Sequence, residues 1–175
     1  MQLISSADMQ KASLSEVYTP GKTYRAIDAT YGEVEAVFIL TVGAVGVAGS
    51  PMFPVTASYT GAGKFLCDDD EDAAGVVGQE WCAGSWLGGV TTAAGYGFVQ
   101  TKGASLVTIT TDDSVAALDI VLPSATDGTW LGLGRAALGT DVTAVATQPC
   151  GFAPAADGGT TMTAGKVWWD IPGLG

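Results

Sequence analysis

The sequence predicts an all-β fold: a single compact β-sandwich or barrel-like domain that carries an extended N-terminal arm. Short segments rich in Val, Ile, Thr and aromatic residues recur about every ten residues, as is typical of sandwiches and barrels. Turn signals such as Asp127-Gly128 and Asp157-Gly158 separate some of them. Glycine, at 25 of 175 residues, disfavours a helical bundle, because each glycine destabilises a helix interior by about 1 kcal/mol.

Residues 1–22 differ in composition from the rest of the chain. They are rich in Ser and charged residues, contain few apolar side chains and end near the turn signal Pro20-Gly21. We therefore expect an N-terminal arm over residues 1–22, with room for one short helix near Asp8–Tyr18, and a β-rich domain over residues 23–175. The first six residues lack the basic and apolar regions of a signal peptide, so we expect none there.

The strand predictions rest on β-branched and aromatic residues bounded by Gly, Pro, Asp and Ser. In the segment that begins at Tyr96, alternation places Tyr96, Phe98 and Gln100 on one strand face and Gly97, Val99 and Thr101 on the other. The predicted strands are Thr23–Ala29, Val34–Val42, Met52–Ser58, Gly75–Trp81, Tyr96–Thr101, Ser105–Thr110, Ala116–Leu122, Thr129–Leu138, Val142–Thr147 and Lys166–Ile171.

An uncharged stretch over residues 36–63 raises the question of a membrane span. Its apolar part ends after about eight residues, and Gly46, Gly49, Pro51 and Pro54 follow. A spanning helix needs about 20 predominantly apolar residues. We therefore expect two buried strands joined by a Gly/Pro turn, and no membrane partner.

The charge balance excludes whole classes of partner. Seven basic residues face 18 acidic ones, which gives a net charge of −11. Such a chain is repelled by the phosphates of nucleic acids and by anionic membrane surfaces. We therefore expect no nucleic-acid partner.

The residue types also limit the chemistry that one chain can perform. Histidine is absent, which removes a Ser-His-Asp triad and the commonest zinc ligand. Paired carboxylates such as Glu33 with Glu35, or Asp112 with Asp113, suit glycoside hydrolysis in principle, but they occupy ordinary strand-edge and turn positions. We expect neither an enzyme nor a cofactor.

The acidic run Asp68–Asp72 must be solvated or paired with cations. We predict a solvated loop and no metal, with a calcium site as the alternative, although the EF-hand pattern is not met.

The three cysteines, Cys67, Cys82 and Cys150, are widely spaced and odd in number, which is unlike a disulfide framework or a CxxC metal site. We predict buried free thiols, and a bridge between Cys67 and Cys82 stays open as the alternative.

Two motifs carry a resemblance to a known family. The stretch 95–103 reads GYGFVQTKG, the stretch 112–125 reads DDSVAALDIVLPSA, and LGRA follows at 133–136. This order resembles the small capsid decoration (cement) proteins of tailed bacteriophages, in which a YG[FW]VQ..G strand precedes a D.sV.aGD.l.pS segment and a closing G.a. Leu118 stands where the family pattern often has Gly. The resemblance covers residues 95–137, about a quarter of the chain.

The resemblance implies a structural protein of the virion that binds the outer capsid surface and stabilises the shell. The implied partners are the major capsid protein and further copies of the chain, with a homotrimer favoured. The charge agrees with an outer position, because the capsid interior holds polyanionic DNA.

The candidate partner contacts are apolar residues of the arm and two tryptophans near the C-terminus. Because neighbours in a strand face opposite sides, one tryptophan is expected in the core and the other can be exposed at an interface; alternatively, the chain termini cover both. The candidates are Leu3, Ile4, Met9, Leu14, Tyr18, Trp168 and Trp169.

Three other functions are compatible with the sequence. The chain could be another virion β-protein, namely a tail tube, a head fibre or a capsid component, or it could be an enzyme. It could also be a carbohydrate-binding or adhesion module, which is indicated by Trp81, Trp86, Trp130, Trp168 and Trp169.

Overall fold

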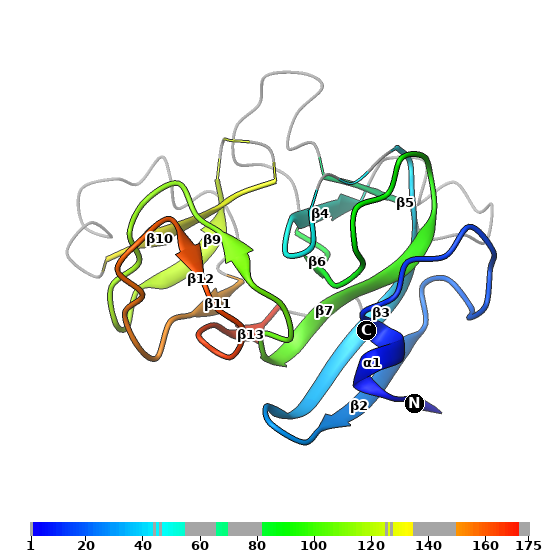
Figure 1. The fold of residues 1–175 in the computed structure, drawn as a ribbon, viewed down its shortest axis with the longest axis horizontal. Coiled ribbons are helices and arrows are strands. Elements are labelled where there is room, and N and C mark those ends of the chain that lie inside the picture. Colours follow the sequence, from blue (N-terminus) through cyan, green and yellow to red (C-terminus); the bar gives the residue numbers. More distant parts are fainter. Residues whose placement is uncertain are drawn as a thin grey trace.

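The computed structural model describes residues 2–43, 45, 47–54, 66–69, 82–124, 126, 128–134 and 150–171. Over these residues the regular structure is almost entirely β-strand, which confirms the all-β prediction (Figure 1). Within these ranges, no helix has the length and apolar character needed to cross a membrane. The elements are β1 (Gln2–Leu3), α1 (Ser6–Met9), β2 (Thr23–Asp28), β3 (Gly32–Thr41), β4 (Pro51–Pro54), β5 (Leu66–Asp68), β6 (Gly84–Trp86), β7 (Tyr96–Ala104), β8 (Ile109–Thr110), β9 (Ile120–Pro123), β10 (Trp130–Leu133), β11 (Gly151–Phe152), β12 (Thr161–Met162) and β13 (Trp168–Asp170).

The strands with strong alternation agree best with the predictions. β2 and β3 match their predicted segments closely, and β7 extends three residues beyond Thr101. β8, β9 and β13 are shorter than predicted, because bends, turns and irregular backbone occupy the rest of each predicted segment. β10 ends at Leu133, and residues 135–138 of its predicted segment lie outside the described residues. No strand was predicted at five short elements, because a strand of two or three residues is too short to show alternation of apolar and polar side chains. These elements are β1, β5, β6, β11 and β12. The predicted strands Gly75–Trp81 and Val142–Thr147 lie outside the described residues.

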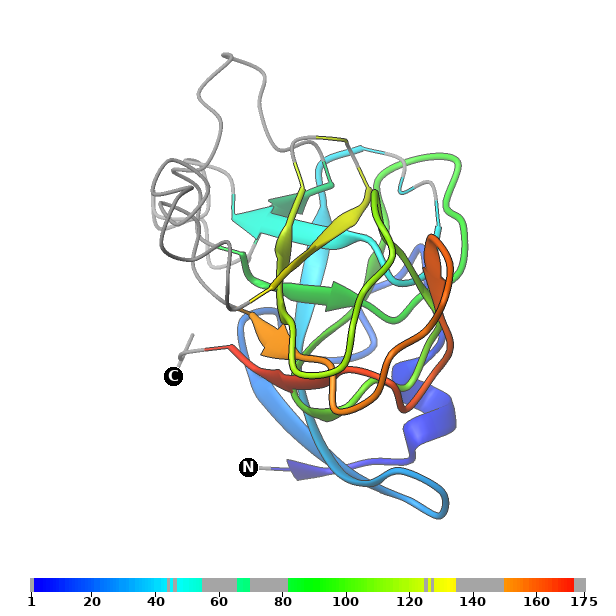
Figure 2. The same ribbon diagram turned by 90° about the vertical axis from the view of Figure 1, so that its left-hand side faces the viewer.

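β7 connects the two parts of an eleven-stranded mixed sheet. One edge of β7 pairs with β3, and the other edge pairs first with β6 and then with β13 (Figure 1). The pairings β3-β5-β4-β6-β7-β3 close into a ring of strands. From β7 the sheet continues through β13, β11 and β9 to β10, and from β3 it continues through β2 to β1. β8 and β12 form a separate pair. Figure 2 gives a second view of the arrangement, turned by 90°.

A ring core fills the space among the strands of this ring. Its members come from all five ring strands and two adjoining loops, and Trp86 is its largest side chain. The Trp86 indole donates a hydrogen bond to the Gly89 carbonyl at 3.2 Å. Two glycines flank the indole: a Cβ on Gly97 would lie 2.3 Å from Trp86 Cη2, and a Cβ on Gly88 would lie 2.5 Å from Trp86 Cζ2. The ring core comprises Val37, Ile39, Val45, Met52, Cys67, Ala83, Trp86 and Val99.

An aromatic core lies where the N-terminal segment packs on β2, β3 and β7. Tyr18 contacts Tyr24, Phe38 and Phe98 edge-on, with ring centroids 5.2 to 5.4 Å apart. Tyr96 stacks on Phe38 at 5.8 Å. Tyr96 and Phe98 thus lie in the aromatic core, whereas Val99 lies in the ring core, which confirms the predicted alternation of β7.

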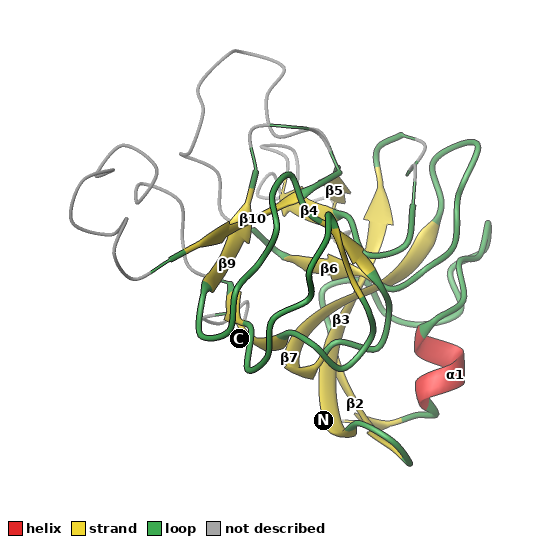
Figure 3. Ribbon diagram, turned by 60° about the vertical axis from the view of Figure 1, so that its left-hand side comes forward, coloured by secondary structure: helices red, strands yellow, loops and turns green. Residues whose placement is uncertain are grey.

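Within residues 2–22, β1 pairs in parallel with β2, and α1 lies beside the sheet (Figure 3). Ser5 caps α1 by accepting the Asp8 amide at 3.0 Å, and Met9 at the end of α1 is fully buried. Ser13 exchanges two backbone hydrogen bonds with Tyr96. Ser6 donates to Asp28 at 2.7 Å, and this bond, followed by the Thr30 amide, holds the pKa of Asp28 below its usual value.

A C-terminal core joins the remaining strands to the ring. Trp130 and Trp169 pack with ring centroids 4.6 Å apart, and both are fully buried. The Trp130 indole donates to the Gly49 carbonyl at 2.6 Å, which ties β10 to the loop before β4. The members are Phe53, Cys82, Ile109, Val115, Val121, Trp130, Cys150, Ala153, Met162, Val167, Trp169 and Ile171.

The first motif of the sequence has a structural explanation at each of its distinctive positions. Gln100 is fully buried, and its amide nitrogen donates to the Ala104 carbonyl at 2.7 Å and to the Lys102 carbonyl at 3.1 Å. Its amide oxygen accepts the Leu106 amide at 3.0 Å. Gly103 has φ +90°, and a Cβ there would lie 2.4 Å from the Glu33 carbonyl oxygen. Gln100 and Gly103 therefore shape the end of β7 and its approach to β3.

The second motif builds the corner before β9. Asp119 accepts the Ala116 amide at 2.8 Å, and Asp112 accepts the hydroxyls of Ser124 and Thr129. Val115 is buried against Gly132, where a Cβ would lie 2.7 Å from Val115 Cγ2. Both motifs that carry the resemblance therefore maintain the fold.

Replacing Gly97 with Ala tests the close packing on Trp86. The added methyl group must displace a buried indole, so we expect Gly97→Ala to lower the free energy of unfolding by about 1–3 kcal/mol. Urea denaturation of the full chain measures this change. The control is Gly89→Ala, because a Cβ at Gly89 meets nothing within 4 Å; we expect a change within about 0.5 kcal/mol there. Equal effects of the two substitutions would contradict the packing described.

Candidate functional site

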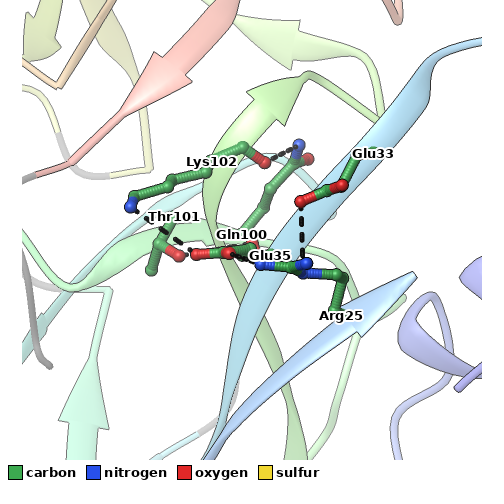
Figure 4. A network of polar contacts seen from close by, with 6 residues as sticks. All are labelled: Arg25, Glu33, Glu35, Gln100, Thr101 and Lys102. Carbon is green, nitrogen blue, oxygen red and sulfur yellow. Dashed lines mark hydrogen bonds and ion pairs between the residues drawn. The ribbon is translucent and has the colours of Figure 1, made fainter. Parts of the chain in front are cut away.

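The polar network on one face of β2, β3 and β7 is the clearest cluster of charged side chains in the described part of the chain (Figure 4). Arg25 contacts two glutamates: its Nε lies 3.1 Å from Glu33 Oε1, and its Nη2 lies 3.0 Å from Glu35 Oε1. Lys102 Nζ lies 3.7 Å from the other oxygen of Glu35. Glu35 is therefore held between two cations.

Strand register explains why these side chains meet. Arg25 on β2 lies opposite Glu35 on β3, Glu35 lies opposite Lys102 on β7, and Lys102 lies opposite Asp170 on β13. Residues directly opposite in a sheet point to the same side, so all four face the same way. The register between β3 and β7 shifts next to Glu35, between Glu35 and Ala36.

Burial decides how much these ion pairs contribute. The side chains of Arg25, Glu33 and Lys102 are 41 to 55% exposed, whereas that of Glu35 is only 14% exposed. Exposed pairs typically contribute about 0–1 kcal/mol, so the Glu33 contact adds little stability. Glu35 has lost most of its water, and it depends on Arg25 and Lys102 for compensation.

A groove of about 440 Å³ opens beside this network, between the β2–β3 hairpin and β13. Gly103 forms part of its lining, where its backbone comes close to β3. Three carboxylates and one ammonium group line the groove, together with two partly exposed aromatic side chains. The side chains concerned are Tyr31, Glu33, Glu35, Lys102, Trp168 and Asp170.

An exposed apolar strip continues from the groove along the sheet. Trp168 on β13 lies directly opposite Phe152 on β11, so the two side chains share the face of Asp170. Trp168 is 46% exposed and Phe152 is 43% exposed. We call Trp168 and Phe152 the apolar strip. Exposed aromatic residues of this kind often anchor protein interfaces.

The structure divides the predicted contact residues into three groups. Leu3, Leu14 and Trp168 are exposed and free to contact a partner. Met9 and Trp169 are fully buried, so as direct contacts they are wrong: Met9 packs in the aromatic core and Trp169 packs on Trp130. Ile4 and Tyr18 are partly buried against the aromatic core. The prediction that one of the two C-terminal tryptophans is buried and its neighbour exposed is confirmed.

Four residues of this surface were not predicted to lie together, namely Arg25, Lys102, Asp170 and Phe152. Each lies on a different strand, and only the register brings them together. The sequence indicated a charged strand face only through Glu33 and Glu35, which are two residues apart on one predicted strand.

Leu118 carries backbone strain at an exposed position. Its φ of +70° is left-handed, and among the described residues it is the one non-glycine with positive φ. Its side chain is 60% exposed, and its amide donates to the Ala153 carbonyl at 2.7 Å. A glycine would adopt this conformation without the cost that a Cβ brings.

All three thiols are buried, and two of them, Cys67 and Cys150, have raised pKa values. All three cysteines are buried and free, so the prediction of free thiols is confirmed and no Cys67–Cys82 bridge is present. A hydrogen bond with the Cys82 thiol, and then burial, raise the pKa of Cys150 well above its usual value. Burial likewise raises the pKa of Cys67. Thiols with raised pKa values stay protonated at neutral pH and are poor nucleophiles.

Other sequence predictions fall partly outside the described residues. The acidic run is described only at Asp68 and Asp69, and Trp81 is not described. Within the described ranges, no group of three or more Cys, Asp or Glu side chains is placed to hold a metal ion.

Known protein families, curated proteins and solved structures were each compared with the chain, and none of them matches it.

Replacing Leu118 tests the strain at this corner. Left-handed backbone costs a residue with a Cβ about 1–2 kcal/mol, whereas glycine loses about 0.5–1 kcal/mol more entropy on folding than alanine. We therefore expect Leu118→Gly to be more stable than Leu118→Ala, by up to about 1 kcal/mol in urea denaturation.

The neighbouring Ala117 provides the control, because it is also exposed but does not have positive φ. There we expect Ala117→Gly to be less stable than the native chain. If Leu118→Ala were more stable than Leu118→Gly, the result would contradict backbone strain at position 118.

Proposed function

We propose that this chain is a non-enzymatic structural protein that binds the outer surface of a tailed-phage capsid and stabilises the shell. The observation that carries the proposal is the structural role of the two motifs that resemble those of decoration proteins. Their buried, hydrogen-bonded and glycine positions build the end of β7 and the corner before β9, including a left-handed backbone at Leu118. A resemblance at positions that shape the fold supports a similar fold, and the proposed role is based on that resemblance.

Charge supports an outer position. The chain carries a net charge of −11, and packaged DNA would repel it from the shell interior. Three cations of the described residues, Lys11, Arg25 and Lys102, form ion pairs with carboxylates of the same chain. They are therefore poorly placed to bind phosphates.

Exposed apolar side chains support a role in binding other proteins. Several large apolar side chains of the N-terminal segment, β2, β11 and β13 are exposed. They are Leu3, Leu14, Val17, Ile27, Phe152 and Trp168. Of these, Trp168 and Phe152 lie directly opposite each other, and neighbouring exposed aromatic residues often anchor protein interfaces. The proposed partners are the major capsid protein and further copies of the chain, with a homotrimer as the favoured assembly.

The competing functions have less support. Trp86, Trp130 and Trp169 are fully buried, so they cannot stack on a sugar, and Trp168 is the exposed tryptophan of the described residues. The three cysteines are buried, and histidine is absent from the chain. A tail-tube, head-fibre or other capsid role uses similar β-modules, and position in the particle distinguishes these from decoration.

Immunogold labelling of virions that encode this chain tests the proposal. An antibody against the full chain should label the heads of intact particles at many sites, because a decoration protein covers the shell. A matched sample of opened particles controls for access. Label confined to tails, or label that appears only after the particles are opened, would contradict the proposed function.

A further inference from the structure

We propose that the groove and the apolar strip form a docking site for a basic segment of a partner protein, with an arginine side chain of that segment in the groove. The inference rests on the proposed function in one respect, namely that the chain binds other proteins. It adds the surface that is used and the chemistry of the partner.

Charge in the groove favours a cation. The lining contains the carboxylates of Glu33, Glu35 and Asp170, and only Lys102 carries a positive charge. Arg25 adjoins the groove but is already paired with both glutamates. Within the described part of the chain, the Asp170 carboxylate has no ion-pair partner and is exposed. The groove therefore keeps an excess of negative charge with one carboxylate free to receive a new cation.

The aromatic residues favour arginine over a compact cation. Trp168 lies two residues before Asp170 on β13, so both side chains stand on the same face of the strand. A planar guanidinium group can stack on an indole while it donates two hydrogen bonds to a carboxylate. Trp168 and Asp170 offer these two partners side by side, and Tyr31 lines the same groove.

The apolar strip extends the site beyond one side chain. Phe152 lies opposite Trp168 and is exposed, so an apolar residue next to the arginine of the partner can cover both rings. β13 is held between β7 and β11, and these pairings fix the positions of Trp168 and Asp170. A surface built on paired strands needs little ordering on binding.

Two other occupants fit this surface less well. A second copy of the chain brings a net charge of −11 to a groove that is already acidic. A neutral sugar can stack on Trp168, but it leaves the excess carboxylate charge uncompensated. A basic protein segment satisfies the charge and the apolar surface together.

The test uses two small probes that differ only in charge, N-acetyl-arginine amide and its neutral isostere N-acetyl-citrulline amide. Amide and indole N–H signals of the ¹⁵N-labelled full chain are followed during titration. We expect saturable shifts at Trp168, Lys102 and Asp170 with the arginine probe, and binding at least about tenfold weaker with the citrulline probe, because the guanidinium charge is lost.

Two variants should shift this affinity in opposite directions. Asp170→Asn removes the free carboxylate and should weaken binding of the arginine probe about three- to tenfold, and Lys102→Met removes the competing cation and should strengthen it. Asp113→Asn is the matched control: it removes one negative charge at an exposed bend that does not line the groove, and it should leave the affinity unchanged.

Equal binding of the two probes, or unchanged affinity in Asp170→Asn with a native spectrum, would overturn the inference. Shifts at Trp168 with maltose but not with the arginine probe would also overturn it, in favour of a sugar site. Its failure is distinguishable from failure of the proposed function: virion heads that label with antibody while the arginine probe does not bind would refute the groove alone. Arginine binding by a chain found only on tails would refute the capsid role alone.

Discussion

The buried amide of Gln100 is the interaction on which the arrangement of this sheet depends. β7 pairs with β6 at Val99 and Gln100, and then with β13 from Lys102 onward, so Gln100 lies where one neighbour ends and the next begins. Its side chain bonds the carbonyls of Lys102 and Ala104 and the amide of Leu106. A buried amide that satisfies several backbone groups strongly favours one chain path. β7 therefore fixes the position of the strands β13, β11, β9 and β10 relative to the ring of strands.

This constraint also positions the surface features. The end of β7 that Gln100 holds contains Gly103, whose close approach to Glu33 lets β7 and β3 come together beside the groove. On the other side of β7, β13 carries Trp168 and Asp170 to the same face. The residues that define the first motif, residues 96–100 and Gly103, are thus buried, whereas Trp168 and Asp170, which are exposed in the groove, lie outside it. A likeness carried by the motif therefore concerns the scaffold, and partner choice depends on the side chains around it.

The sequence predicted the parts of the fold that have a local signal. Alternation in β3 and β7 was readable because each strand is nine or ten residues long and separates two different cores. β6 and β11 were not readable, because strands of two or three residues are defined by their neighbours. Met9 looked like part of a free arm, yet it is buried, because distant strands supply its contacts. The groove was missed for the same reason: its charges come from separate strands, and register is not visible in one sequence.

Amide hydrogen exchange at Leu106 tests the role of Gln100 most directly. Leu106 lies in a bend outside the strands, and its amide is bonded to the Gln100 side chain. If that bond holds the sheet together, the Leu106 amide should exchange as slowly as the Val99 amide in the middle of β7, because both then open only with the whole domain. Exchange of Leu106 at the fast rate of exposed loop amides such as Val90, while Val99 stays protected, would contradict the account.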